Sequence, residues 1–477
     1  MGRLNQLLVC IALGSMASIA VYTQSRGASG TVLYEGARLV IGNASAPIEG
    51  GAFVVQNGRI ASVGRRGAVT APADATRVDL AGKTVMPAMN NVHIHIGYEG
   101  YTSWSAQNHT RENVLDHLQR EAFYGVGAAM TMGDQPDDFA IQFQQDQAAG
   151  KLSPSARFFF AAGMAPPGGG PDSLLITGTT PLHAVHEVST PGEARAAVQQ
   201  IAARKIGQIK FWVDDRDNRR GKNMKKLQPE VYGAIIDEAH RHGIVVHAHV
   251  TNMADQKAVV KAGVDVVVHT ITAEKLDDEY VALLRDKKPY WAPVMGLGDR
   301  PELCDGDGAF VEQDLPAKTV ADIREGRNAF NMAGCNAPPN PNAAAREENL
   351  KYNFLKMIES GARIVLSTDA GVLPKYSFGS AEHHEMGMYA KLGLSPAQIV
   401  IAATSRPAEV LRIKDAGTIA VGNRADFIVL NANPLENIRN AREIDSVYLS
   451  GVKVDRRALV AGWKRKAASQ EVNGGRK

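Results

Sequence analysis

The chain has 477 residues, of which 44% are hydrophobic and 22% charged, and its formal net charge is +3. These proportions are ordinary for a folded globular protein with one large domain or a few small ones. Lys and Arg are spread along the chain, which excludes the basic footprint of a nucleic-acid binder. We therefore expect a small molecule as the partner, and the sequence leaves a homo-oligomer open.

Residues 1–20 have the layout of a secretory signal peptide. Arg3 precedes an apolar run over residues 7–17, and Ser18-Ile19-Ala20 has the small-x-small pattern of a cleavage site. The run is shorter than the roughly 20 residues of a membrane-spanning helix. We expect a periplasmic or secreted protein, with no stable membrane insertion after the signal is removed. In that oxidising compartment Cys304 and Cys335 can pair, but their spacing does not establish a disulfide.

Both ends of the chain have the sequence pattern of short β-strands. Strands are predicted at residues 31–39, 51–56, 59–63 and 77–80, and again at 425–430 and 446–449. Asn57-Gly58 and Gly82 mark turns, because these residues adopt the positive backbone angles that tight turns need. We predict that residues 28–87 and 411–463 together build one small β-sandwich. The polar residues 464–477 are predicted to form a disordered tail.

The middle of the chain, residues 88–410, alternates short apolar runs with helical patterns. The predicted strands are residues 92–96, 128–132, 158–162, 208–213, 244–249, 265–269, 290–294 and 363–367. Helices are predicted between them, for example at residues 191–203, 229–241 and 254–262. Eight such units predict an α/β fold, a (β/α)8 TIM barrel.

Two further features of the middle region bear on function. An open doubly wound sheet would favour a Gly-rich phosphate loop, and the glycines at residues 168–170 lack the spacing of one. The longest loop, residues 296–341, follows the seventh strand, and loops of this length are often lids or insertions beside active sites.

Polar residues recur at the C-terminal ends of the predicted barrel strands. His93 and His95 share one face of the first strand, because side chains two apart point the same way. Lys210 lies in an apolar strand, where an unpaired ammonium is costly unless it reaches the surface. His247 and His249 end the fifth strand, His269 ends the sixth and Asp369 ends the eighth. Since these ends converge in a TIM barrel, we interpret the set as an active site.

At these positions the chain resembles the amidohydrolase superfamily, in particular its imidazolonepropionase-like and dipeptidase-like branch. The resemblance spans residues 32–454. It is carried by Val92-His93-Ile94-His95, Ile209-Lys210-Phe211-Trp212-Val213-Asp214, His249 followed by His269, Ser367-Thr368-Asp369-Ala370-Gly371, Ala403-Thr404-Ser405-Arg406-Pro407-Ala408 and Gly422-Asn423-Arg424-Ala425-Asp426. It also implies the β-sandwich split between the two ends.

The resemblance implies a binuclear metal site. His93, His95 and Asp369 would hold the first divalent ion, and His249 and His269 the second. Lys210, carboxylated by carbon dioxide to a carbamate, would bridge the two, since two cations stabilise the negative charge of the carbamate. Histidine, carboxylate and carbamate ligands suit Zn²⁺ best, with manganese, cobalt or nickel as alternatives.

Some assignments stay open. His247 and His249 share a face, and His249 is favoured because it lies nearer the strand end and its spacing to His269 matches the branch. His247 and His384 are weak candidates for substrate binding. The chain departs from the family pattern at three positions: Asn91 replaces an Asp, Ala88 a Gly, and Gly170 a His.

Our hypothesis is hydrolysis of an amide bond of a small molecule, such as a dipeptide or N-acyl amino acid, by a metal-bridging hydroxide. Asp369 would take the proton of the water and pass it to the leaving nitrogen. A lactone or phosphotriester hydrolase on the same site is the alternative. A deaminase of the superfamily would usually carry a Glu where this chain has Asn252. A barrel that binds ligand without turnover would not need the complete ligand set.

Overall fold

The computed structural model describes residues 30–100, 103–171, 174, 181–216, 223–296, 302–304, 308–327, 334–338, 341–372 and 377–474, with side chains described up to residue 467. The predicted signal peptide, residues 1–20, lies outside the described residues. Among the described residues, none of the helices has the length and apolar character that crossing a bilayer requires.

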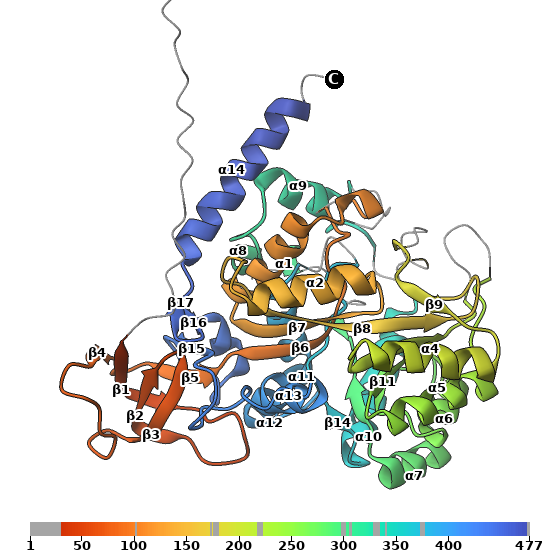
Figure 1. The fold of residues 1–477 in the computed structure, drawn as a ribbon, viewed down its shortest axis with the longest axis horizontal. Coiled ribbons are helices and arrows are strands. Elements are labelled where there is room, and N and C mark those ends of the chain that lie inside the picture. Colours follow the sequence, from red (N-terminus) through yellow and green to blue (C-terminus); the bar gives the residue numbers. More distant parts are fainter. Residues whose placement is uncertain are drawn as a thin grey trace, which may run out of the picture.

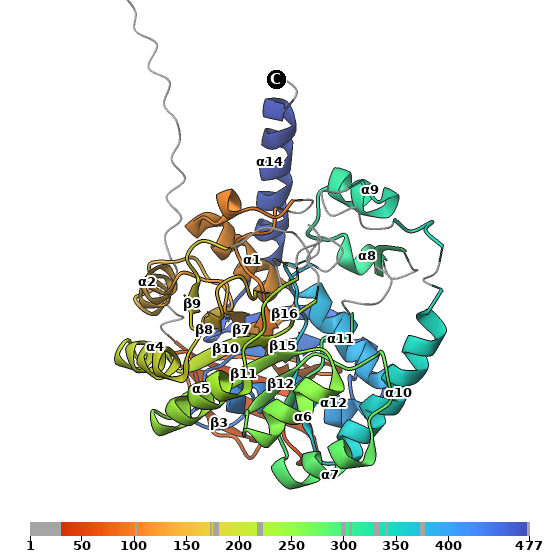
Figure 2. The same ribbon diagram turned by 90° about the vertical axis from the view of Figure 1, so that its right-hand side faces the viewer.

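Eight parallel strands curl into a barrel in the middle of the chain (Figures 1 and 2). They are β6 (Met89–Ile94), β7 (Val126–Met132), β8 (Arg157–Ala165), β10 (Gln208–Val213), β11 (Val245–Val250), β12 (Val266–Val268), β13 (Tyr290–Ala292) and β14 (Arg363–Ile364). The short β9 (Val185–Glu187) pairs with β8. All eight predicted strands are present. Most of their residues are fully buried, which is why they read as continuous apolar runs in the sequence.

Backbone hydrogen bonds join the first strand of the barrel to the segment after the last. The N–H of Val92 donates to the carbonyl of Leu366 (3.1 Å), and the N–H of His95 donates to that of Ala370 (2.7 Å). These bonds close the sheet, so the predicted TIM barrel is confirmed, and the C-terminal ends of its strands meet at one mouth.

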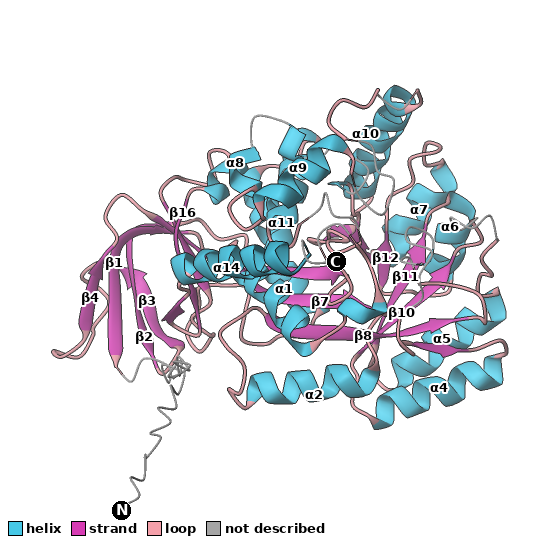
Figure 3. Ribbon diagram, turned by 90° about the horizontal axis from the view of Figure 1, so that it is seen from above, coloured by secondary structure: helices cyan, strands magenta, loops and turns pink. Residues whose placement is uncertain are grey.

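Helices surround the barrel (Figure 3). They are α1 (Arg111–Phe123), α2 (Asp137–Ala148), α4 (Pro191–Ala203), α5 (Pro229–Arg241), α6 (Met253–Lys261), α7 (Asp278–Lys287), α10 (Ala343–Glu359), α11 (Ser380–Lys391), α12 (Pro396–Ala403) and α13 (Ser405–Val410). Helix α4 shows why the sequence predicts them. Thr190 and Glu193 form a capping box around Pro191, and the helix buries one face through Ala194, Val198 and Ile201.

Strands from both ends of the chain form a second, mixed sheet. They are β1 (Thr31–Leu39), β2 (Ile48–Gln56), β3 (Arg59–Arg65), β4 (Thr76–Asp79), β5 (Thr84–Pro87), β15 (Phe427–Leu430), β16 (Ile444–Leu449) and β17 (Val452–Lys453). The two ends meet where β5 pairs antiparallel with β15. Asn57 and Gly58 both have positive φ angles, as the tight turn between β2 and β3 requires. The predicted joint unit is present, and its strands are connected in one sheet.

Two segments differ from the expectation or go beyond it. The predicted loop over residues 296–341 contains η3 (Glu302–Cys304), α8 (Gly308–Val311) and α9 (Ala317–Glu325) in its described parts, and Cys304 and Cys335 form a disulfide. The predicted disordered tail is wrong for residues 464–474, which continue α14 (Arg456–Gly474). This helix projects from the body (Figures 1 and 2). Its Ala, Lys and Arg residues have high helix propensity, although the segment as a whole is polar. The ring of Trp463 packs against that of Phe123 and anchors the helix.

Candidate metal centre

The first strand of the barrel places two histidine rings side by side. His93 lies on β6 and His95 follows it directly, and both side chains are fully buried inside the barrel. Their Nε2 atoms are 3.2 Å apart. Two imidazole nitrogens so close together and shielded from water suit one shared cation better than two separate hydrogen-bond partners.

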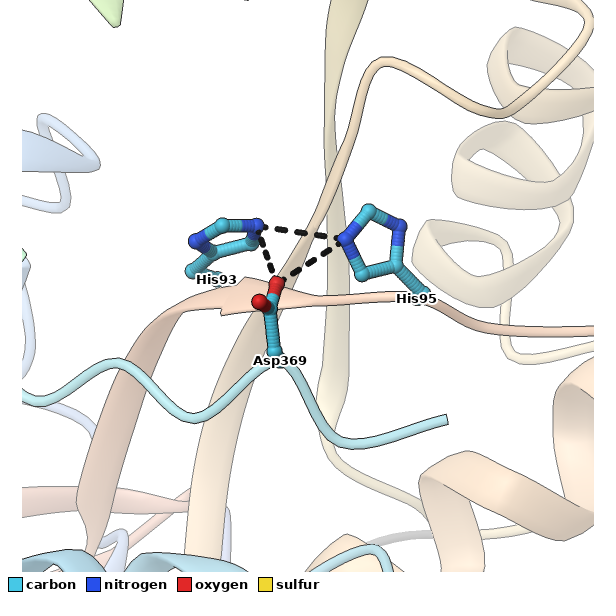
Figure 4. Close-up of side chains that lie close together, drawn as sticks. All are labelled: His93, His95 and Asp369. Carbon is cyan, nitrogen blue, oxygen red and sulfur yellow. Dashed lines mark hydrogen bonds and ion pairs between the residues drawn. The ribbon is translucent and has the colours of Figure 1, made fainter. Parts of the chain in front are cut away.

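Asp369 faces both rings from the segment after β14 (Figure 4). Its Oδ1 lies 2.7 Å from Nε2 of His93 and 3.1 Å from Nε2 of His95. One ligand atom from each of the three residues lies within 4.8 Å of the others. Asp369 has a φ of 59°, an uncommon backbone angle for a residue other than glycine. Its N–H donates to the carbonyl of His93 (3.0 Å), which fixes this conformation against β6.

Asp134, just beyond β7, orients His95. Its Oδ2 lies 2.8 Å from Nδ1 of His95, and its Oδ1 accepts a hydrogen bond from the Thr131 hydroxyl at 2.5 Å. A carboxylate at Nδ1 holds the proton of the ring there and leaves Nε2 as the metal-binding nitrogen.

The charges of these groups suit metal binding. Burial lowers the pKa of His93 to about 3, so its ring is neutral at physiological pH. Burial opposes ionisation of Asp369, but His93 and His95 outweigh it and hold the pKa of that carboxyl well below its ordinary value. Burial also lowers the pKa of His95, yet Asp134 and then Asp369 raise it to about 10. The carboxylates of Asp134 and Asp369 therefore favour a positive charge at this group of side chains, as a metal ion would supply.

The remaining predicted ligands border the same group. Nζ of the fully buried Lys210 lies 3.4 Å from Nε2 of His93. Nδ1 of His269 lies 3.8 Å from Oδ2 of Asp369. The ring centroid of His269 is 4.5 Å from that of His249 and 5.6 Å from that of His93. All six predicted ligands thus meet at the mouth of the barrel.

A match to the amidohydrolase family model covers residues 84–454. The chain belongs to the amidohydrolase family. Ochratoxinase of Aspergillus niger is 24% identical over 450 residues, which cover 87% of this chain and 84% of that protein. Imidazolonepropionase of Deinococcus radiodurans is 30% identical over 105 residues, covering 21% of this chain and 25% of that protein.

A solved structure of a Xaa-Pro dipeptidase with methionine bound in its active site has the same fold. The TM-score is 0.68 at 24% identity, and the alignment covers 89% of this chain and 99% of the dipeptidase. The family match makes the protein a metal-dependent hydrolase, and its donor set fits the cation that the family implies. His93, His95 and Asp369 supply two imidazoles and a carboxylate, the ligand types preferred by zinc.

The two histidines of β11 lie at different depths in this amidohydrolase barrel. His247 pairs in register with Lys210, and its Nε2 lies 2.8 Å from Oε1 of Gln208, the first residue of β10. Burial lowers its pKa well below the ordinary value, so it is a neutral core residue. His249 lies one step nearer the mouth, beside the ring of His269. This arrangement favours His249 over His247 as the candidate metal ligand from this strand.

Sequence reasoning missed the carboxylate that holds His249. Oδ2 of Asp214 lies 2.7 Å from Nε2 of that ring, and Nε of Arg216 donates to both oxygens of Asp214 (2.9 and 2.8 Å). Asp214 and Arg216 thus fix the orientation of the His249 ring. Asp134 plays the corresponding part for His95. The available signal was a carboxylate directly after a predicted barrel strand.

His384 lies in a different polar group. Its Nδ1 is 3.0 Å from Oε1 of Glu302, which also pairs with Arg442. This contact ties α11 to the disulfide-bonded segment after β13. The ion pair gives the largely buried His384 a partner, and its weak candidacy for substrate binding stays a prediction.

Proposed function

We propose that this protein is a binuclear metal-dependent hydrolase that cleaves an amide C–N bond of a small molecule, such as a dipeptide or N-acyl amino acid. The observation that carries the proposal is the meeting of six predicted ligands at one buried mouth. The likeness to a Xaa-Pro dipeptidase supports a dipeptide-like substrate. His93, His95 and Asp369 would hold the first ion, and His249 and His269 the second, with Zn²⁺ as the preferred metal. When bound, these ions would activate water and stabilise negative charge on the carbonyl oxygen.

Lys210 is proposed to bridge the two ions as a carbamate. A buried ammonium beside His93 would repel cations, whereas its neutral amine can add carbon dioxide and lose a proton to give an anionic ligand. The ring of Trp212, whose centroid lies 5.5 Å from Nζ, shields this position.

Asp369 is proposed to move the proton. It is ionised in the folded protein, since His93 and His95 hold its pKa low, and it faces both halves of the site. From there its carboxylate can accept a proton from water and deliver it to the leaving nitrogen.

A substrate panel with the zinc-loaded protein tests the function. We expect turnover of dipeptides or N-acyl amino acids. Asp369→Asn should lower kcat at least about 100-fold while metal content stays nearly intact, because the amide oxygen remains a ligand. If only lactones or phosphotriesters are hydrolysed, the protein is a lactone or phosphotriester hydrolase and the proposed amide cleavage is wrong. Full activity of the variant would refute the role of Asp369.

We also propose a periplasmic or secreted location. The signal-like residues 1–20 and the Cys304–Cys335 disulfide both support it, since disulfides persist in oxidising compartments. Cell fractionation, with the mass of the mature chain, tests this. An uncleaved chain in the cytosol would contradict it.

A further inference from the structure

A buried polar group behind the metal centre contains three residues that the proposed chemistry does not use. Asn91 lies on β6, two residues before His93. Glu382 lies on α11 and Glu121 on α1. All three side chains are inaccessible to solvent. Burying two carboxyls and an amide is costly unless their hydrogen bonds are matched, so the arrangement calls for a physical reason.

The amide of Asn91 joins the two segments that carry the first metal site. Its Oδ1 accepts a hydrogen bond from the N–H of His93 at 2.8 Å. Its Nδ2 donates to Oγ1 of Thr368 at 2.8 Å, next to Asp369. The bonds fix the direction of the amide, because the N–H of His93 can only donate and so requires the oxygen on its side.

The second acceptor for the amide of Asn91 is Glu382. Nδ2 of Asn91 donates to Oε1 of Glu382 at 2.5 Å. Burial, and next the neighbouring Glu382, raise the pKa of Glu121 well above its ordinary value. Burial also raises the pKa of Glu382, although the hydrogen bond from Asn91 opposes this. Oε1 of Glu382 is therefore the acceptor that faces position 91.

We propose that Asn91 is a positioning residue for the first metal site and that its amide is matched as a donor to Glu382. An aspartate at position 91 would put a third carboxyl against this pair and would lose the donated bond. The pairing accounts for the departure from the family pattern at Asn91. The proposal rests on the proposed function only in taking His93, His95 and Asp369 as metal ligands.

An exchange of donor and acceptor tests the pairing. The variants are Asn91→Asp, Glu382→Gln and the double variant with both changes. The readouts are the Tm of the metal-free protein and the Kd for zinc. Asn91→Asp should lower the Tm by about 5 °C and weaken zinc binding roughly 10- to 100-fold. Glu382→Gln should change little, since the new amide keeps an oxygen for Asn91. The double variant should regain most of both losses, because an amide at 382 can donate to a carboxylate at 91.

Asn91→Ala combined with Glu382→Gln is the matched control. Its Tm and its affinity for zinc should stay below those of the parent, because alanine at position 91 offers no acceptor to the new amide at position 382. If Asn91→Asp yields no soluble protein, recovery of soluble yield in the double variant takes the place of the Tm. The proposal is overturned if Asn91→Asp matches the parent, or if the double variant is no better than Asn91→Asp. The Tm of the metal-free protein decides the pairing even if the parent binds no zinc.

Discussion

Gly371→Ala tests how closely the segment after β14 must approach β6. Gly371 has a φ of 92°, and a Cβ placed on it would lie 1.8 Å from the carbonyl oxygen of His95. Gly361 is a matched control, because its φ is 89° and a Cβ there would meet nothing within 4 Å. Both substitutions place alanine in an unfavourable backbone conformation, at a cost of about 1–2 kcal/mol. Only Gly371→Ala also forces the two backbones apart.

The added cost of Gly371→Ala follows from the contacts. The His95 backbone cannot retreat without breaking the 2.7 Å bond from its N–H to Ala370. Overpacking and the lost bond together add about 3 kcal/mol. Urea unfolding of the metal-free variants measures the difference, and zinc titration should show weaker binding only for Gly371→Ala. Equal losses of unfolding free energy in the two variants would refute this account of barrel closure.

Three further predictions concern other parts of the molecule. Asp134→Asn should weaken zinc binding about tenfold, because a neutral acceptor replaces the charged one at His95; an unchanged Kd by titration would deny the orienting role. Burial raises the pKa of Glu99 to about 8, partly offset by Arg120, so the folded chain keeps a proton that the unfolded chain releases above about pH 4.5. The free energy of unfolding of the parent therefore falls as pH rises from about 4.5 to 8. Over that range the free energy of unfolding of Glu99→Gln, measured in urea, should gain on that of the parent by up to about 1.4 kcal/mol per pH unit. A difference that stays constant with pH would contradict this. Removing the Cys304–Cys335 bond, which spans 31 residues, should destabilise the protein by about 3–4 kcal/mol and speed proteolysis between the two cysteines; cleavage at the parent rate would count against it.

The barrel could be predicted because its strands are buried on both faces. In residues 245–250 every residue except the two histidines is apolar, so the histidines stand out against that background. The last strand was less predictable. Only the two residues of β14 are regular strand, and Val365 and Leu366 keep single backbone bonds to Trp291 and Val92 before the positive φ of Asp369 turns the chain toward the site.

Features that depend on tertiary contact could not be predicted. The partners of His95 and His249, Asp134 and Asp214, are distant in sequence, and only the closed barrel brings each pair together. Strand alternation cannot separate His247 from His249, whereas depth in the barrel does. The disulfide required the fold of the segment after β13, since it joins Cα atoms 5.2 Å apart that sequence spacing does not locate.

The metal content per chain tests most directly whether the site is binuclear and bridged by Lys210. Elemental mass spectrometry would be applied to the purified parent, to Lys210→Ala, and to Lys151→Ala as the control at a side chain that is 65% exposed. We predict about two metal ions per chain in the parent and in Lys151→Ala, with a marked loss in Lys210→Ala. A single ion or none in the parent, or two ions unaffected by Lys210→Ala, would contradict the claim.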